Sequence, residues 1–232
     1  EIEWEHGGVP RKRNGELGVG EVLLEFATLD FEIARWWQAR AGILLVPIGA
    51  YNVLHDAPTQ DITTRPLVST YVAPSTWYES GAGFFGELEP GGTLLSYEAY
   101  AINGLDTKLY DGLGARAARG SLAEDNNQHK AAVGRVEWQP LTGLKVGLSG
   151  YHGAYDPGGT RYVDMGAWDL AARLGPVEVQ GEGVRAWIDP GFDEGWANAT
   201  RNPVPEGMGG VYGQLNAHLR LAPLNAALPA DL

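Results

Sequence analysis

The sequence contains no cysteine among its 232 residues. This absence excludes disulfide bridges, thiolate metal sites and cysteine nucleophiles together. Long hydrophobic runs are also missing: the best one, 39–50, is interrupted by Arg40 and Pro47. It is well short of the ~18 apolar residues that a membrane-spanning helix needs. If this chain meets a membrane, we expect it to do so without a spanning helix.

Positive charge is scarce, with 17 Lys and Arg against 29 Asp and Glu, a formal net charge of -12. Nucleic-acid-binding proteins usually carry the opposite excess, so we expect no nucleic-acid partner. Hydrophobic residues make up 44% of the chain, which is too apolar for a disordered segment. The mean hydropathy of -0.20 still permits a transmembrane β-barrel, because only alternate residues of its strands face lipid.

Apolar and polar residues alternate with a period of two along most of the chain, which is typical of β-strands with two different faces. The clearest segment is 211–221, where Gln214, Asn216, His218 and Arg220 lie opposite an apolar face that includes Leu215. The pattern predicts ten strands, near 1–6, 18–27, 35–46, 80–88, 92–102, 131–139, 142–153, 161–174, 176–188 and 208–221. Several reach the ~9–11 residues that cross a bilayer at a tilt.

The connections between these strands alternate between long and short. Segments 7–17, 47–79, 103–130 and 189–207 are long and 154–160 is intermediate, whereas 28–34, 89–91, 140–141 and Gly175 are short. In an antiparallel meander, alternate connections lie at the same end, so all the long ones fall on one side. Outer-membrane barrels have this asymmetry, and a soluble sandwich with Greek-key connections does not.

Aromatic residues fit the same topology. Trp36, Trp37 and Trp138 are expected near the short-turn end, and Tyr151, Tyr155, Tyr162 and Tyr212 near the long-loop end. Amphipathic rings favour both membrane interfaces. The alternative is that they are core aromatics of a soluble barrel.

Three stretches resemble a group of bacterial porin-like outer-membrane proteins related to the phosphate-selective porin O/P type. They are 41–49 with its continuation to Trp77, the run 124–127 before the strand 131–139, and 209–212. The resemblance implies a β-barrel that passes small solutes. Such porins have ~16–18 strands, so we expect this chain to be one barrel domain, 1–232, that is incomplete at its C-terminus and possibly at its N-terminus.

Candidate sites for chemistry are weak. Residues 81–86 match the G-x-G-x-x-G pattern, but a turn follows where a dinucleotide site needs a helix, so we interpret them as part of a strand. His55 and Asp56 are adjacent on the chain. This adjacency favours a structural role in a loop over a catalytic dyad. The other histidines have no metal-ligand spacing. We therefore expect no enzyme activity, no metal and no cofactor.

The long segment 47–79 is rich in Pro, Thr, Tyr and Trp, and long loops of this kind are usually functional or disordered. We expect it to fold into the barrel and narrow it, with Asp56, Asp61, Arg65 and Trp77 as constriction residues. A position across the outer rim is the alternative. The residues expected to line the lumen are Arg40, Glu98, Arg135, Glu137, Lys145, Asp169, Arg173, Gln214, Asn216, His218 and Arg220.

The prediction is thus an all-β, antiparallel, up-and-down transmembrane β-barrel of the bacterial outer membrane, with about ten strands here out of about sixteen. Its expected function is passive diffusion of small hydrophilic solutes or ions. Expected partners are membrane lipid, those solutes and, possibly, further copies in a trimer or other envelope proteins. Two alternatives stay open: a scaffolding barrel with a blocked lumen, and a soluble β-rich carbohydrate-binding module.

Overall fold

A computed structural model describes residues 2–4, 22–24, 27–54, 61–62, 64–111, 114–119, 129–190 and 204–218. The expected sites at Asp56 and Arg220, and the His55-Asp56 pair, lie outside these residues. Among the described residues no helix is long and apolar enough to span a membrane.

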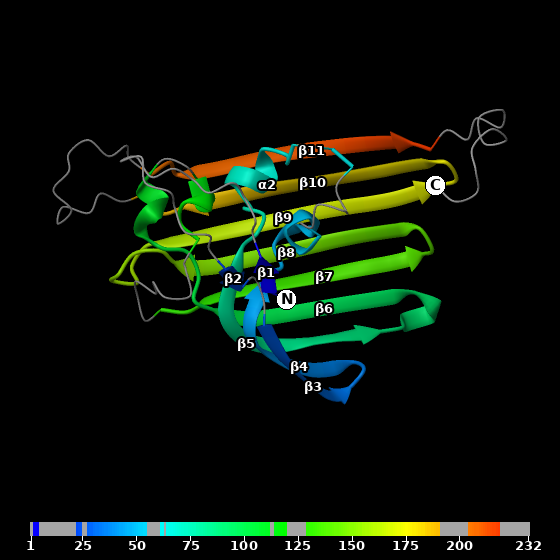
Figure 1. The fold of residues 1–232 in the computed structure, drawn as a ribbon, viewed down its shortest axis with the longest axis horizontal. Coiled ribbons are helices and arrows are strands. Elements are labelled where there is room, and N and C mark those ends of the chain that lie inside the picture. The colour runs from blue at the N-terminus through cyan, green and yellow to red at the C-terminus, as the bar shows by residue number, and fades with distance from the viewer. Residues whose placement is uncertain are drawn as a thin grey trace.

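The protein is all-β, with one nine-stranded antiparallel sheet in which every strand pairs with its neighbours in the sequence (Figure 1). Its strands are β3 (Ala27–Ala34), β4 (Trp37–Leu45), β5 (Tyr78–Leu88), β6 (Leu94–Ile102), β7 (Ala131–Leu141), β8 (Leu144–Ala154), β9 (Tyr162–Leu174), β10 (Val177–Ile188) and β11 (Gly207–Ala217). Two short strands, β1 (Ile2–Trp4) and β2 (Val22–Leu24), form a separate two-stranded sheet.

One expected connection is wrong. The segment 28–34, predicted as a short link, lies almost entirely in strand β3, whose Ala27 pairs with Ile43 of β4. The turn is at Arg35 and Trp36. The apolar residues Leu29, Phe31 and Ile33 alternate with polar ones, so the strand pattern was present in the sequence. The strand was not predicted because it directly follows another apolar stretch, which was assigned to the strand 18–27.

The up-and-down topology places successive connections at opposite ends of the sheet. The tight turns at 35–36, 142–143 and 175–176 and the short link 89–93 lie at one end, shown on the right of Figure 1. The longer connections 46–77, 103–130, 155–161 and 189–206 leave and re-enter the sheet at the other end. The sorting of loops by length that the sequence predicts is confirmed. We call these the turn end and the loop end.

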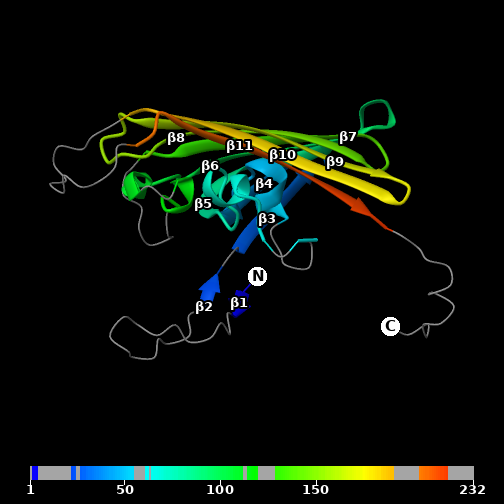
Figure 2. The same cartoon turned by 90° about the horizontal axis from the view of Figure 1, so that it is seen from above.

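The nine-stranded sheet is curved, and the helical segments lie on its concave side (Figure 2). Helices α1 (Gly49–Val53) and α2 (Val68–Tyr71) belong to the connection between β4 and β5. The 3-10 turns η3 (Thr107–Asp111) and η4 (Gly114–Arg116) belong to the next long connection, and η2 (Pro90–Gly92) to a short one. The chain thus places the described parts of segment 46–77, which are 46–54, 61–62 and 64–77, against the concave face.

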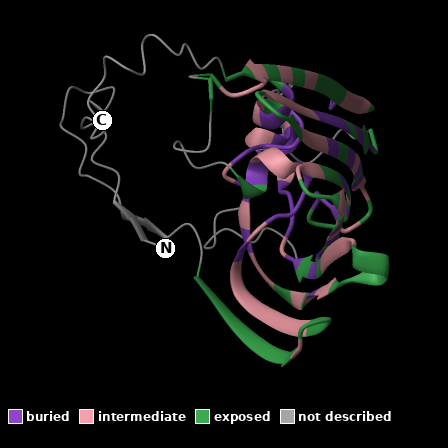
Figure 3. Ribbon diagram, turned by 90° about the vertical axis from the view of Figure 1, so that its right-hand side faces the viewer, coloured by how far each residue is buried: buried purple, intermediate pink, exposed green. Residues whose placement is uncertain are grey.

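The hydrophobic core lies between the concave face and these connections, as the buried residues in Figure 3 indicate. It includes Ile102, Val133, Tyr151, Val163 and Val184 from the strands, and Val46, Ile48, Val68 and Trp77 from the connection. Tyr151 and Tyr155, expected as interface aromatics, are core residues with 3% and 0% exposure. Their position at the loop end is as predicted, but the long connections cover them.

The G-x-G-x-x-G segment 81–86 lies within strand β5 and no nucleotide-binding helix follows it. A Cβ at Gly83 would come within 2.0 Å of the carbonyl oxygen of Ala99, and one at Gly81 within 2.5 Å of that of Ala101. These glycines therefore permit close strand packing, as the structural interpretation predicts.

Candidate functional site

The polar residues of the strands gather on the concave face of the sheet. The antiparallel register places Arg40, Glu98, Arg135, Lys145 and Asp169 on that face, in neighbouring strands β4 to β9. The remaining described residues of the expected lumen set, Glu137, Arg173, Gln214, Asn216 and His218, share it. Side chains one position apart point to opposite faces of a strand. The alternation in the sequence therefore assigned all ten described residues to one face correctly.

A network of charged side chains crosses this face near its centre. The Arg135 guanidinium donates two hydrogen bonds to the Asp169 carboxylate, one of them at 2.9 Å, and a third to Glu137 at 3.1 Å. Lys145 pairs with the other oxygen of Glu137 at 3.0 Å. Arg135 and Asp169 are 7% and 4% exposed. Arg135 and Asp169 are thus each paired with a side chain of opposite charge, and a buried ion needs such a partner to remain ionised.

A second group of polar side chains continues the network toward strand β3. Arg40 forms a bidentate pair with Asp30, with both nitrogen–oxygen distances 2.7 Å. Its guanidinium carbon lies 4.2 Å from the centroid of the Phe85 ring. The Tyr100 hydroxyl donates to Glu98 at 3.0 Å and lies 3.5 Å from Arg40. Polar contacts therefore extend over the strands from β3 to β9.

Helix α1 is held against this face by the buried carboxylate of Glu182 on β10. One Glu182 oxygen accepts from the Tyr51 backbone N–H at 2.9 Å, and the other accepts from the Ser69 hydroxyl at 3.1 Å. Glu182 is 1% exposed. The same carboxylate therefore fixes both the α1 and the α2 portions of segment 46–77.

Gly49 is the point of closest approach between the segment and the sheet. Its φ is +71°, and a Cβ there would lie 2.5 Å from a Glu182 oxygen. Its N–H donates to the Ser149 hydroxyl on β8 at 2.9 Å. Only glycine combines a left-handed backbone with this small volume. The run Pro47-Ile48-Gly49 therefore directs the chain off strand β4 and onto the sheet.

The end of the segment that leads into β5 is fixed by hydrogen bonds from two side chains, Asn52 in the same segment and Arg119 in the next long connection. Asn52 donates to the carbonyls of Val46 and Trp77 and accepts from the Trp77 N–H. Thr76 has a left-handed φ of 62°, which is unfavourable for a β-branched residue. Arg119 donates to the carbonyls of Ser75 and Thr76 and to the Thr76 hydroxyl, and these bonds stabilise that backbone.

The described residues of the expected constriction occupy three different environments. Trp77 is fully buried, with its indole N–H donating to Glu79 at 3.0 Å. Arg65 donates to the Ser75 hydroxyl within its own segment. Asp61 accepts from the side chains of Gln214 and Asn216 on β11, at 2.8 Å and 2.6 Å. Asp61 and Trp77 therefore contact residues of the concave face, whereas Arg65 bonds within its own segment.

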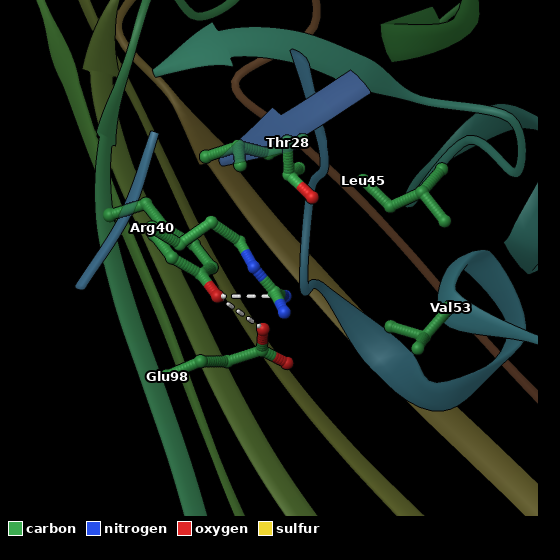
Figure 4. Close-up of a pocket in the computed structure, with 7 residues that line it drawn as sticks. Thr28, Arg40, Leu45, Val53 and Glu98 are labelled. Carbon is green, nitrogen blue, oxygen red and sulfur yellow. Dashed lines mark hydrogen bonds between the residues drawn. The ribbon is translucent and has the colours of Figure 1, made fainter. Parts of the chain in front are cut away.

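Three hollows lie where the segment borders the open part of the concave face. One of about 180 Å³ lies between Arg40, Glu98 and Tyr100 on the strands and Leu45 and Val53 (Figure 4). A neighbour of about 210 Å³ shares Val53 and Glu98 and extends to Arg135 and Glu137. The third, about 120 Å³, lies on the other side of α1 between Tyr51, Asp61, Asp169 and Tyr212. Polar groups and open space thus coincide at this boundary.

The connection 155–161 at the loop end has its own acidic anchor. Asp156 accepts hydrogen bonds from the N–H groups of Thr160 and Arg161, both at 2.9 Å, and from the Thr160 hydroxyl. Burial would raise the pKa of Asp156, but these hydrogen bonds outweigh burial and hold its pKa below the ordinary value. Sequence reasoning placed Glu182 on the polar face of its strand but missed its anchoring role, and it missed Asp156, because an acid that binds backbone has no characteristic spacing.

The described part of the concave face offers charge, hydrogen bonds and open space. Within the described ranges, no group of three or more His, Asp or Glu side chains could hold a metal ion.

No family model matches this chain, and no solved structure does. An uncharacterized protein of Aquifex aeolicus (strain VF5) is 34% identical over 152 residues, which are 64% of this chain and 33% of that protein. The match covers a third of the relative's length, so the relative is about 460 residues long (152 divided by 0.33).

Proposed function

We propose that this chain forms part of the wall of a bacterial outer-membrane β-barrel through which small hydrophilic solutes and ions diffuse. The observation that carries the proposal is the chemistry of the convex face. Strand after strand exposes large apolar side chains there: Leu29, Phe31, Ile33, Trp37, Phe84, Leu88, Val136, Trp138, Val146, Leu148, Trp168, Leu174, Trp187, Val211 and Leu215.

An apolar face of this extent is unusual for a protein surrounded by water. Leu148, near the middle of β8, is 63% exposed, and Leu29 and Leu215 on the two outermost strands are each 69% exposed. Soluble monomers rarely expose contiguous apolar patches of more than a few hundred Å². A face that extends from β3 to β11 is explained when lipid covers it.

The strands have the length that a membrane requires. Within the nine-stranded sheet all strands but β3 are 9 to 13 residues long, and a tilted transmembrane strand needs ~9–11. The turn end also carries exposed indoles: Trp36 stacks on Trp37 with centroids 6.2 Å apart, and Trp37 on Phe84 at 5.6 Å. Indole rings at one level of an apolar face are typical of a membrane interface.

The two outer strands of the sheet, β3 and β11, support a larger closed structure. Each pairs on one side only within the nine-stranded sheet. Free strand edges are not tolerated in lipid, because their N–H and C=O groups would lack partners. Additional strands must therefore close the barrel. The matched relative is about twice as long as this chain (about 460 against 232 residues), which leaves room for the ~16–18 strands of a porin.

The concave face then lines the lumen, and segment 46–77 occupies part of it. A barrel of 16–18 strands leaves a wide aqueous channel. The charged network and the three hollows lie where segment 46–77 borders the face, and solutes would pass them there. This assigns the segment the narrowing role that the sequence suggests.

Conductance in a planar lipid bilayer tests the proposal directly. The protein, extracted in detergent from its native membrane, should insert and give discrete conductance steps in 1 M KCl. A variant with residues 61–70 deleted should give larger steps, because the deletion removes α2's contact with Glu182. Unchanged steps would place the segment outside the conducting path. Stable insertion with no conductance would favour the scaffolding barrel.

Lipid contact can be tested separately from conduction. Trp138, Trp168 and Trp187 are 46–52% exposed on the convex face, whereas Trp77 is fully buried on the concave side. Lipids with brominated acyl chains should quench a large part of the tryptophan emission, and Trp168→Phe should reduce the quenched part while Trp77→Phe should not. A protein that stays monodisperse without detergent and is not quenched would instead be the soluble carbohydrate-binding module.

A further inference from the structure

Acidic residues outnumber basic residues on the concave face, and the two kinds differ in how they are paired. Its acids in the nine-stranded sheet are Asp30, Glu32, Glu79, Glu87, Glu98, Glu137, Asp169, Glu178 and Glu182, and its bases are Arg40, Arg135, Lys145 and Arg173. The wall that these strands form is therefore acidic, in agreement with the formal net charge of -12 for the whole chain.

Every base on this face already has an acidic partner. Arg40 pairs with Asp30, Arg135 with Asp169 and Glu137, and Lys145 with Glu137. Arg173 lies 3.5 Å from Glu178, which also contacts His218. Their positive charges are therefore largely neutralised locally, and little positive potential extends into the space next to the sheet.

Glu98 is in a different position from these paired acids. The hydrogen bond that its carboxylate accepts comes from a neutral group, the Tyr100 hydroxyl. The two nearest bases are directed elsewhere, since Arg40 is held by Asp30 and Arg135 by Asp169 and Glu137. Glu98 also lines both hollows on the β4 side of α1, and Figure 4 shows it beside one of them.

On the basis of the proposed channel, we propose that the lumen prefers cations over anions and that Glu98 is a specificity-determining residue of this preference. A ring or patch of one sign of charge sets the ion selectivity of a pore. Here the paired bases cannot offset the acids, and an acid without a cationic partner borders the open space. The substrate class is small hydrated cations and cationic organic solutes.

The test is the reversal potential of the intact protein in a planar bilayer under a tenfold KCl gradient. The wild-type protein should be more permeable to K⁺ than to Cl⁻. Glu98→Gln should lower the ratio of K⁺ to Cl⁻ permeability by up to about 16-fold, because a unit negative charge roughly 5 Å away in water attracts K⁺ about fourfold and repels Cl⁻ about fourfold. The effect should shrink as salt rises, because salt screens exposed charges.

Two further variants separate the charge of Glu98 from its structural role. Glu98→Asp keeps the charge and should keep the selectivity. Asp164→Asn removes the same charge from the convex face, where Asp164 pairs with His152, and should leave the permeability ratio unchanged. Preference for Cl⁻, or equal ratios in Glu98→Gln and Asp164→Asn, would overturn the inference and leave the channel proposal intact. Absence of any conductance would overturn the channel proposal, and the inference with it.

Discussion

The two faces of the nine-stranded sheet have opposite chemistry, although the same strands build both. On β8, Leu148 is 63% exposed on the convex face, whereas the adjacent Ser149 binds the backbone of Gly49 on the concave face. In a water-soluble protein the apolar face of a sheet is the one that is covered. Here the long connections lie on the concave face and the apolar residues of the convex face stay exposed, as the proposed contact with lipid requires.

The concave face is also divided along its length. At the loop end, Ile102, Val133, Tyr151, Val163 and Ile188 are buried beneath the long connections. Toward the turn end, Lys145, Arg173 and His218 are at least half exposed. The loop-end half is thus an ordinary hydrophobic core, and the other half resembles the wall of a water-filled space.

An arginine introduced at the centre of the convex face should lower the stability of the protein more than any other substitution considered below. We expect Leu148→Arg to destabilise the protein by about 2–4 kcal/mol in lipid, the cost of a cation at the membrane midplane on the outside of a barrel. Urea unfolding in phospholipid vesicles measures this. His218→Arg, which places a guanidinium beside Glu178 on the concave face, should change stability by less than about 0.5 kcal/mol. Equal effects at the two positions would mean that the faces do not differ in environment.

Gly49→Ala should break the contact between segment 46–77 and the sheet. The new methyl group meets the Glu182 carboxylate, and the left-handed backbone is itself unfavourable for alanine. We expect a loss of about 1–3 kcal/mol, together with faster proteolysis of the segment. Gly91→Ala is a matched control, because Gly91 has a similar φ of +61° and open space around it. Gly91→Ala should lose the stability that a left-handed alanine costs, but proteolysis of segment 46–77 should not become faster.

Glu182→Gln should have a smaller effect at the same contact. The amide retains one oxygen to accept a hydrogen bond, but its NH₂ group meets either the Tyr51 N–H or the Ser69 hydroxyl, and the hydrogen bonds lose their ionic character. The expected loss is about 1–2 kcal/mol, measured by thermal unfolding. Ser69→Ala should account for only part of that loss. A larger effect of Ser69→Ala than of Glu182→Gln would contradict the central role of the carboxylate.

The smallest expected effect is local and depends on pH. The folded pKa of Asp156 is lowered from 3.8, so its contribution is present above pH 3.8 and is lost as the pH falls through the lowered folded pKa. Asp156→Asn should therefore speed amide exchange at Thr160 and Arg161 at neutral pH. The difference between variant and wild type should vanish in acid below pH 3.8. A difference that persists there would show that the carboxylate charge is not what orders this connection.

Much of the fold could be read from the sequence because a strand with two chemically different faces carries a period of two in its sequence. Val136 and Trp138 alternate with Arg135 and Glu137, and this pattern alone placed them on opposite faces correctly. Strand β3 was missed because its start is continuous with the apolar residues before it. The sorting of long and short connections survived that error, because it depends on the order of strands along the chain.

The sequence by itself determined which residues share a face, since that follows from the geometry of an extended chain. Only the tertiary structure decided which residues meet across it. Arg135 and Asp169 are 34 positions apart, and Tyr51 and Glu182 are 131 apart. Such pairs depend on strand register and on how segment 46–77 folds back over the sheet. Both arise from packing and backbone hydrogen bonds between distant segments, which leave no periodic signal in the sequence.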